Sequence, residues 1–156
     1  MQPATSSPGS PYPKFFLMLA VSFVVMYVVM YLNTYALDHV YFSLMRFYMT
    51  WLMVLPMALI MLGFMGHMYQ NKSTNRLIVL GSVALFAGVF AMMRAQTFVD
   101  DVTWMKGMIP HHSIAILTSE RATLRDPEVR KLADGIISTQ KREIGEMQAM
   151  IKRLEK

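Results

Sequence analysis

The sequence contains no cysteine among its 156 residues. Disulfide bonds, thiolate metal sites and thiol catalysis are therefore excluded. Methionine becomes the only soft sulfur ligand available, and the chain has 17 of them. Any chemistry that needs a soft metal must depend on thioether sulfur.

Charged residues are scarce in the first 93 positions, which hold four Lys or Arg and one acidic residue. Residues 94–156 hold eleven Lys or Arg and nine acidic residues, the composition of a water-exposed domain. The net charge of +5 divides into +3 and +2 between these parts and forms no dense basic run. Nucleic-acid binding therefore has little support, and membrane lipid is the expected partner of the first part.

Three apolar runs within residues 14–93 predict a membrane anchor in an all-α protein. The expected spans are at about residues 15–33, 44–69 and 77–93, with Pro56 as a kink in the second and a polar loop at residues 70–76. Residues 1–13 are rich in Pro and Ser and predict a disordered tail. The tail lacks the features of a signal peptide, so we expect it to be retained.

The Lys and Arg residues between the spans predict the orientation of the anchor. With the N-terminus in the cytoplasm, three basic residues (Lys14, Lys72 and Arg76) lie inside and two (Arg46 and Arg94) lie outside. This margin is slim. It places residues 94–156 outside the cytoplasm as a helical domain.

Two residue patterns in the spans suggest helix packing. Methionine recurs every four residues in the second span, at Met45, Met49, Met53, Met57, Met61 and Met65. Such a line winds about halfway round a helix, which favours a packing ridge over a soft-metal path. In the third span the small residues Gly81, Ala84, Gly88 and Ala91 form a line that would allow close contact with another span or another copy of the chain.

The most unusual surface is predicted between residues 98 and 112. On a helix, Asp101, Met105, Met108 and His112 share one face, and His111 lies beside them. Apolar packing needs neither the carboxylate nor the imidazoles. Thioether combined with imidazole is the ligand set that copper prefers, Cu(I) above all.

A second strip is predicted downstream, where Gln140, Glu143, Met147 and Met150 share one face of a helix. Between the strips, Asp126 and Pro127 are a good N-cap and a good first helical residue. Antiparallel helices around this break would bring the strips together. The register set by the break pairs His111 with Gln140, Met108 with Glu143, Met105 with Met147, and Asp101 with Met150.

The helix boundaries follow from the positions of Pro and Gly. Residues 94–106 contain neither, so the third span is expected to continue outward until Gly107 and Pro110 interrupt it. Pro110 would then start a helix to about residue 124, and a last helix would run from Pro127. The last helix has an apolar seam at near-heptad spacing, formed by Val129, Leu132, Ile136, Ile144, Ile151 and Leu154.

The stretch Met-x-x-Met-Ile-Pro-His-His, followed by Ile-Ile-x-x-Gln-x-x-Glu-Ile-x-x-Met, resembles the domain-of-unknown-function 305 family over roughly residues 97–155. The resemblance implies a ferritin-like helical bundle, and some members of the family are periplasmic copper-binding proteins associated with copper tolerance. It falls on Met105, Met108, His111, His112, Gln140, Glu143 and Met147. Ser113 departs from the family, in which Gln is common there.

We therefore expect a metal site formed by Met105, Met108, His111, His112, Glu143 and Met147, with Cu(I) favoured over Cu(II). Zinc is the alternative metal, through the two His and a carboxylate. A di-iron or di-manganese site is disfavoured because residues 94–156 contain no Glu-x-x-His spacing.

The expected function is that of a copper-binding protein of the bacterial inner membrane, with three spans and its C-terminal domain in the periplasm. It would sequester or transfer copper, in tolerance or homeostasis. The alternative is a membrane structural or assembly protein whose helical domain binds a partner without metal. Ser113 lies in no Gly-x-Ser-x-Gly elbow, so no catalytic residue and no enzymatic activity are expected. A homo-oligomer could form through the third span or the last helix.

Overall fold

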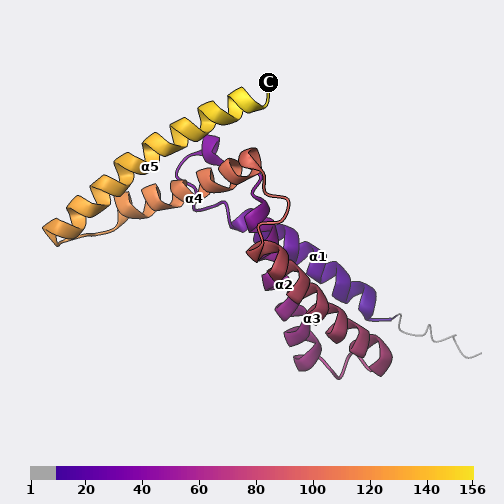
Figure 1. Cartoon of the computed structure of the whole chain (residues 1–156). Coiled ribbons are helices and arrows are strands. Elements are labelled where there is room, and N and C mark those ends of the chain that lie inside the picture. The colour runs from indigo at the N-terminus through magenta and orange to yellow at the C-terminus, as the bar shows by residue number, and fades with distance from the viewer. Residues whose placement is uncertain (1–9) are drawn as a thin grey trace, which may run out of the picture.

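The computed structural model describes residues 10–156, and these residues form helices and no strand (Figure 1). The elements are α1 (Tyr12–Val29), the 3-10 helix η1 (Leu37–His39), α2 (Leu44–Phe64), α3 (Lys72–Arg94), α4 (Asp101–Arg121) and α5 (Pro127–Leu154). The predicted all-α class is confirmed. Most of the predicted N-terminal tail, residues 1–9, lies outside the described residues, and α1 begins at Tyr12 within the rest of it.

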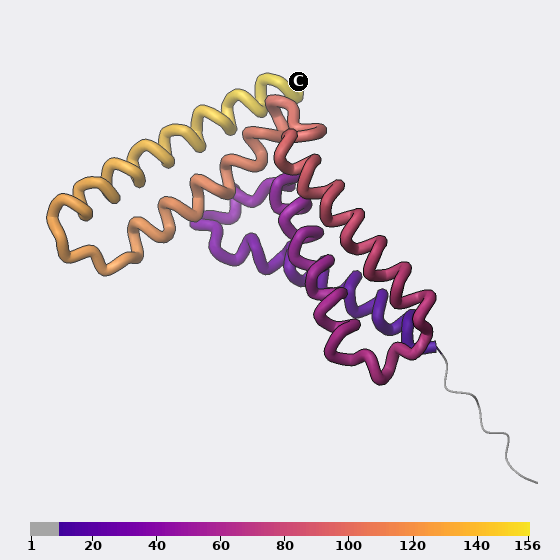
Figure 2. The backbone as a smooth tube through the Cα atoms, turned by 60° about the horizontal axis from the view of Figure 1, so that its bottom comes forward, coloured from indigo at the N-terminus to yellow at the C-terminus, as the bar shows by residue number. Residues whose placement is uncertain are grey.

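Helices α1, α2 and α3 are each long and apolar enough to cross a membrane. They run side by side, with α2 packed against both of the others (Figure 2). A buried cluster near one end joins all three helices through Phe15, Ala58 and Ile78. Tyr69 belongs to the same cluster, because the chain folds back after α2 ends at Phe64.

The first span was predicted at about residues 15–33, whereas α1 covers Tyr12–Val29. Two further span boundaries were displaced by local interactions. The second span ends at Phe64 and not near residue 69, so that Tyr69 is buried outside the helix. The third starts at Lys72, within the predicted loop, because the Asn71 side chain accepts hydrogen bonds from the N–H groups of Ser73 and Thr74. An N-cap of this kind satisfies donors that a helix end leaves free.

Only some of the regularly spaced methionines and glycines of the spans make packing contacts within the chain. Met61 and Met65 pack on the buried cluster, whereas Met45, Met49 and Met53 remain exposed. A Cβ placed on Gly81 or Gly88 would meet nothing within 4 Å. The close contact predicted for these two glycines is therefore not made within the described chain.

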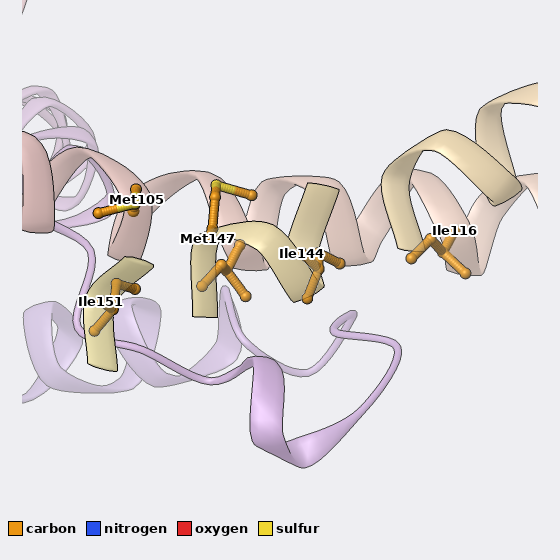
Figure 3. Close-up of a cluster of buried hydrophobic side chains, with 6 residues drawn as sticks. Met105, Ile116, Ile144, Met147 and Ile151 are labelled. Atoms are coloured by element: carbon orange, nitrogen blue, oxygen red, sulfur yellow. The ribbon is translucent and has the colours of Figure 1, made fainter. Parts of the chain in front are cut away.

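Helices α4 and α5 form the predicted antiparallel hairpin (Figures 1 and 2). The break comes where expected, since the Asp126 carboxylate accepts the N–H groups of Glu128 and Val129 at 2.9 and 3.0 Å and Pro127 begins α5. The core of the hairpin consists of Met105, Ile109 and Ile116 from α4 and Ile144, Met147 and Ile151 from α5 (Figure 3).

The prediction that α3 continues outward to Lys106 was wrong. Between α3 and α4 the backbone takes left-handed φ values at Gln96 (51°) and Phe98 (62°), although neither residue is Gly. This change of backbone direction separates α3 from α4. Asp100 then caps α4 by accepting the Thr103 N–H at 2.7 Å. The hydrogen bond from the Thr103 hydroxyl, and after it the one from the Thr103 N–H, lowers the pKa of the Asp100 carboxyl.

Gly107 and Pro110 do not interrupt α4, contrary to the prediction. The helix runs unbroken through both residues, although a proline inside a helix removes one backbone hydrogen bond. Pro110 is buried, and packing of α4 against its neighbours holds the helix together at this point.

The segment between α1 and α2, residues 30–43, packs against the hairpin, and we call it the docking loop. The Tyr35 N–H donates a hydrogen bond to the Ser113 Oγ at 2.7 Å, and His39 Nδ1 lies 2.9 Å from the same oxygen. On α5, Gln148 donates to the Asp38 carbonyl, and the Lys141 Nζ lies 5.3 Å from the centre of the Tyr35 ring. The hairpin is thus held against the end of the three apolar helices by side chains of both α4 and α5.

We expect Ser113→Ala to loosen this attachment. The fully buried Ser113 hydroxyl is the acceptor for the Tyr35 N–H, and an unsatisfied donor there costs about 1–3 kcal/mol. Thermal unfolding of the full chain in detergent should shift to lower temperature, and residues 30–43 should become sensitive to protease. Ser138→Ala, on an exposed part of α5, is the control. Equal behaviour of the two variants would contradict this account.

Candidate metal centre

The central contact of the candidate site joins the two helices of the hairpin. The His112 Nε2 on α4 lies 2.8 Å from the Glu143 Oε2 on α5. The His112 side chain is 12% exposed and that of Glu143 is 37% exposed, so water reaches only the carboxylate freely. Because an ionised carboxylate only accepts hydrogen bonds, the Nε2 atom carries the proton in this contact.

The other ring nitrogen of His112 has no partner. Its Nδ1 is buried and makes no hydrogen bond to any of the described residues. A buried polar atom without a partner is costly and uncommon in folded proteins. In a neutral imidazole that is protonated on Nε2, this atom holds a free lone pair, the form in which histidine binds a metal ion.

Three of the predicted thioether ligands lie in the same interface. Met105 and Met147 are buried at 4% and 5% exposure within the hairpin core, and the half-buried Met108 packs against that core. Figure 3 shows Met105 on α4 and Met147 on α5 among the isoleucines. These methionines therefore also stabilise the hairpin by apolar packing, as methionine side chains commonly do.

His111 is not part of this interface. It is exposed, and the centre of its ring lies 6.1 Å from that of the His112 ring, with the two planes at 62°. Successive residues on a helix point about 100° apart, so only one of two neighbouring histidines can face α5. Asp101 and Met150, at the ends of the predicted strips, are also exposed.

The register of the hairpin differs from the prediction at the central pair. Glu143 was expected to face Met108, but its carboxylate pairs with His112, one helical turn further along α4. Helices α4 and α5 are separated by five residues, 122–126, and the position of the break alone could not fix how far this connection offsets them.

Sequence reasoning missed the surroundings of Ser113. Ser113 is fully buried and contacts His39 of the docking loop, whose side chain is 12% exposed. The Asp38 carboxylate lies 3.9 Å from the His39 Nε2, on the outer side of the ring. This group does not form a catalytic triad, because the Ser113 hydroxyl is enclosed and already accepts the Tyr35 N–H. No local pattern connects residues so far apart in the sequence.

Two ion pairs join the helices of the hairpin. Lys141, in the middle of α5, donates to Glu120 near the end of α4 at 2.7 Å, which lowers the pKa of the Glu120 carboxyl and raises the pKa of the Lys141 ammonium. Lys106, in the first part of α4, pairs with Glu155 just after α5. Both pairs are partly exposed to solvent and contribute little stability, but they favour the antiparallel register observed.

The chemistry available at the site is that of one oriented imidazole and several thioethers. Residues 10–156 contain no group of three or more His, Cys, Asp or Glu side chains that could hold a metal ion. A metal bound at His112 would therefore depend on sulfur from Met105, Met108 or Met147 in addition to the His112–Glu143 pair.

Comparison with known proteins places this hairpin in a family. No solved structure matches the chain. An uncharacterized protein of Acanthamoeba polyphaga mimivirus is 33% identical over 138 residues, covering 86% of this chain and 89% of the relative. The likeness to this relative therefore extends beyond the hairpin into the three long apolar helices. Residues 92–156 match the family model described as "Domain of unknown function (DUF305)", and the chain belongs to this domain-of-unknown-function 305 family.

Proposed function

We propose that this chain is a membrane-anchored copper-binding protein whose hairpin holds Cu(I) outside the cytoplasm, to sequester it or to transfer it. The observation that carries the proposal is the state of His112. Glu143 fixes its ring and leaves the buried Nδ1 without a partner, in an interface that also contains Met105, Met108 and Met147.

The His112–Glu143 pair has the arrangement that metal-bound histidines commonly show. A histidine ligand usually donates its second N–H to a carboxylate or carbonyl, which fixes the ring and makes the free nitrogen a stronger ligand. In this assignment His112 is the imidazole ligand and Glu143 orients it. The exposed His111 is the imidazole that an incoming ion would meet first.

The thioethers favour Cu(I) over other metals. Soft sulfur ligands select Cu(I), whereas Zn(II) and Cu(II) depend more on nitrogen and oxygen. In the interface between α4 and α5, His112 offers a nitrogen atom and Glu143 offers oxygen atoms. The other candidate ligands in this interface are methionines. Zinc is therefore the second choice for this site.

We expect replacement of Met108 and Met147 by Leu to lower the Cu(I) affinity sharply and the Zn(II) affinity much less. The exchange nearly conserves volume and apolarity, so it should cost less than about 1.5 kcal/mol of stability. The measurement is a Cu(I) competition titration on the full chain in detergent. Replacing Met53 and Met57 by Leu removes the same number of thioethers from α2 and is the matched control. Equal Cu(I) affinity in both variants would remove sulfur from the site.

Glu143→Ala tests whether the carboxylate orients His112. We expect the 15N spectrum of the wild type to show His112 protonated at Nε2, and this preference should weaken in the variant. Loss of such an orienting partner typically lowers metal affinity about 10–100-fold. Glu146→Ala, on an exposed part of α5, is the control. An unchanged spectrum together with unchanged copper affinity would contradict the assignment.

The same proposal places the hairpin outside the cytoplasm, as on the periplasmic side of a bacterial inner membrane. It is supported by the Lys and Arg count and by the three helices that are long enough to span a membrane. We expect a reporter enzyme that is active only outside the cytoplasm to work when fused after Lys156. Activity of a cytoplasmic reporter alone at that position would reverse the orientation.

A further inference from the structure

Helix α5 has apolar side chains on a face that α4 does not cover. Val129, Leu132, Met150 and Leu154 are 47%, 66%, 38% and 50% exposed, while Ala133, Ile144, Met147 and Ile151 are buried. Together with the half-buried Ile136, the exposed residues form a line along the helix, which we call the outer seam. The sequence had suggested one apolar seam, but the structure divides it between two adjacent faces.

The outer seam also points away from the docking loop. The loop contacts α5 through Lys141 and Gln148. At 100° per residue, these two positions lie on the side of the helix opposite Ile136 and Leu154. Within the described chain, the outer seam is therefore left to solvent or to a partner.

The spacing of the outer seam is that of helix-on-helix packing. Val129, Ile136 and Met150 fall on one heptad line, and Glu143 occupies the remaining position of that line. In a four-helix bundle each helix packs against two neighbours and needs two apolar faces. The hairpin supplies two helices, and α5 has the second face that a bundle of two hairpins requires.

We propose that a second copy of this chain packs its α5 antiparallel against the outer seam. The inference rests on the seam and on the charges beside it, and it holds whether or not the hairpin binds metal. Centred close to residue 140, the antiparallel pairing brings Val129 of each copy to Met150 of the other. This pairing would also cover the part of the Glu143 side chain that is now exposed to solvent.

The charges beside the seam favour an antiparallel second copy. Glu128 and Arg153 are exposed at opposite ends of α5 on the same flank of the outer seam. In an antiparallel pair, Glu128 of one copy lies next to Arg153 of the other, twice by symmetry. In a parallel pair, equivalent residues lie on opposite flanks of the interface and at the same end, so Glu128 of one copy would not lie next to Arg153 of the other.

The shape of the chain permits this arrangement in one membrane. Figures 1 and 2 show the hairpin extending at an angle from the end of the three membrane helices, rather than continuing their direction. Two chains related by a two-fold axis along the membrane normal can therefore lay their α5 helices side by side in opposite directions. Closed two-fold pairs are the commonest form of homo-oligomer.

Single cysteines test the pairing cleanly, because the chain has none of its own. Thr139 lies close to the proposed two-fold axis on the seam side, and Ser138 points about 100° away from it. We expect Thr139→Cys in the full chain, in detergent with a chelator present, to form a disulfide-linked dimer when oxidised with diamide. Ser138→Cys should stay monomeric on the same non-reducing gel. Equal cross-linking of both variants would overturn the proposal.

Two further outcomes decide against the antiparallel pair. Cross-linking of Val129→Cys to itself would show a parallel contact, and cross-linking of Gly88→Cys without Thr139→Cys would place the contact at α3. As an independent measurement, light scattering should give a dimer for the wild type and a monomer for Leu132→Glu, with unchanged helical circular dichroism. Leu132 is 66% exposed, so the charge should not unfold the chain. A monomeric wild type would overturn the proposal and leave the seam to lipid or to another protein.

Discussion

A buried hydroxyl, that of Ser113, lies at the centre of the contact between the two parts of this protein. The Ser113 Oγ accepts the Tyr35 N–H and lies within hydrogen-bond distance of His39, so the loop that leaves α1 is held to the middle of α4. The hairpin is consequently attached by the chain after α3 and by the docking loop, which Gln148 and Lys141 of α5 contact as well. His112 directly precedes Ser113 on α4, and its ring points toward Glu143 of α5.

The core of the hairpin combines packing with the candidate chemistry. Met105 and Met147 fill apolar space between the helices, and both are also candidate sulfur ligands. A carboxylate at the edge of this core, that of Glu143, lies within hydrogen-bond distance of the His112 ring and orients it. The candidate ligands are therefore side chains that also hold α4 and α5 together.

Local signals in the sequence were enough to predict the hairpin. Asp126 and Pro127 mark the start of α5, and the spacing of Met105 and Met147 indicates the faces that meet. The break before α4 was missed because its left-handed residues, Gln96 and Phe98, are not glycines. The contact between Tyr35 and Ser113 joins positions 78 residues apart, and helical periodicity carries no information at that separation. The one-turn offset at Glu143 likewise depends on packing along the whole interface.

The unequal burial of the methionines bears on how the protein withstands oxidants. Oxidation of methionine to the sulfoxide turns an apolar side chain into a polar one and depends on exposure of the sulfur. Met105 and Met147, at 4% and 5% exposure, are shielded by the helices they join, whereas Met150 is 38% exposed. Oxidants would thus reach Met150 at the rim of the hairpin before they reach Met105 and Met147 in its core.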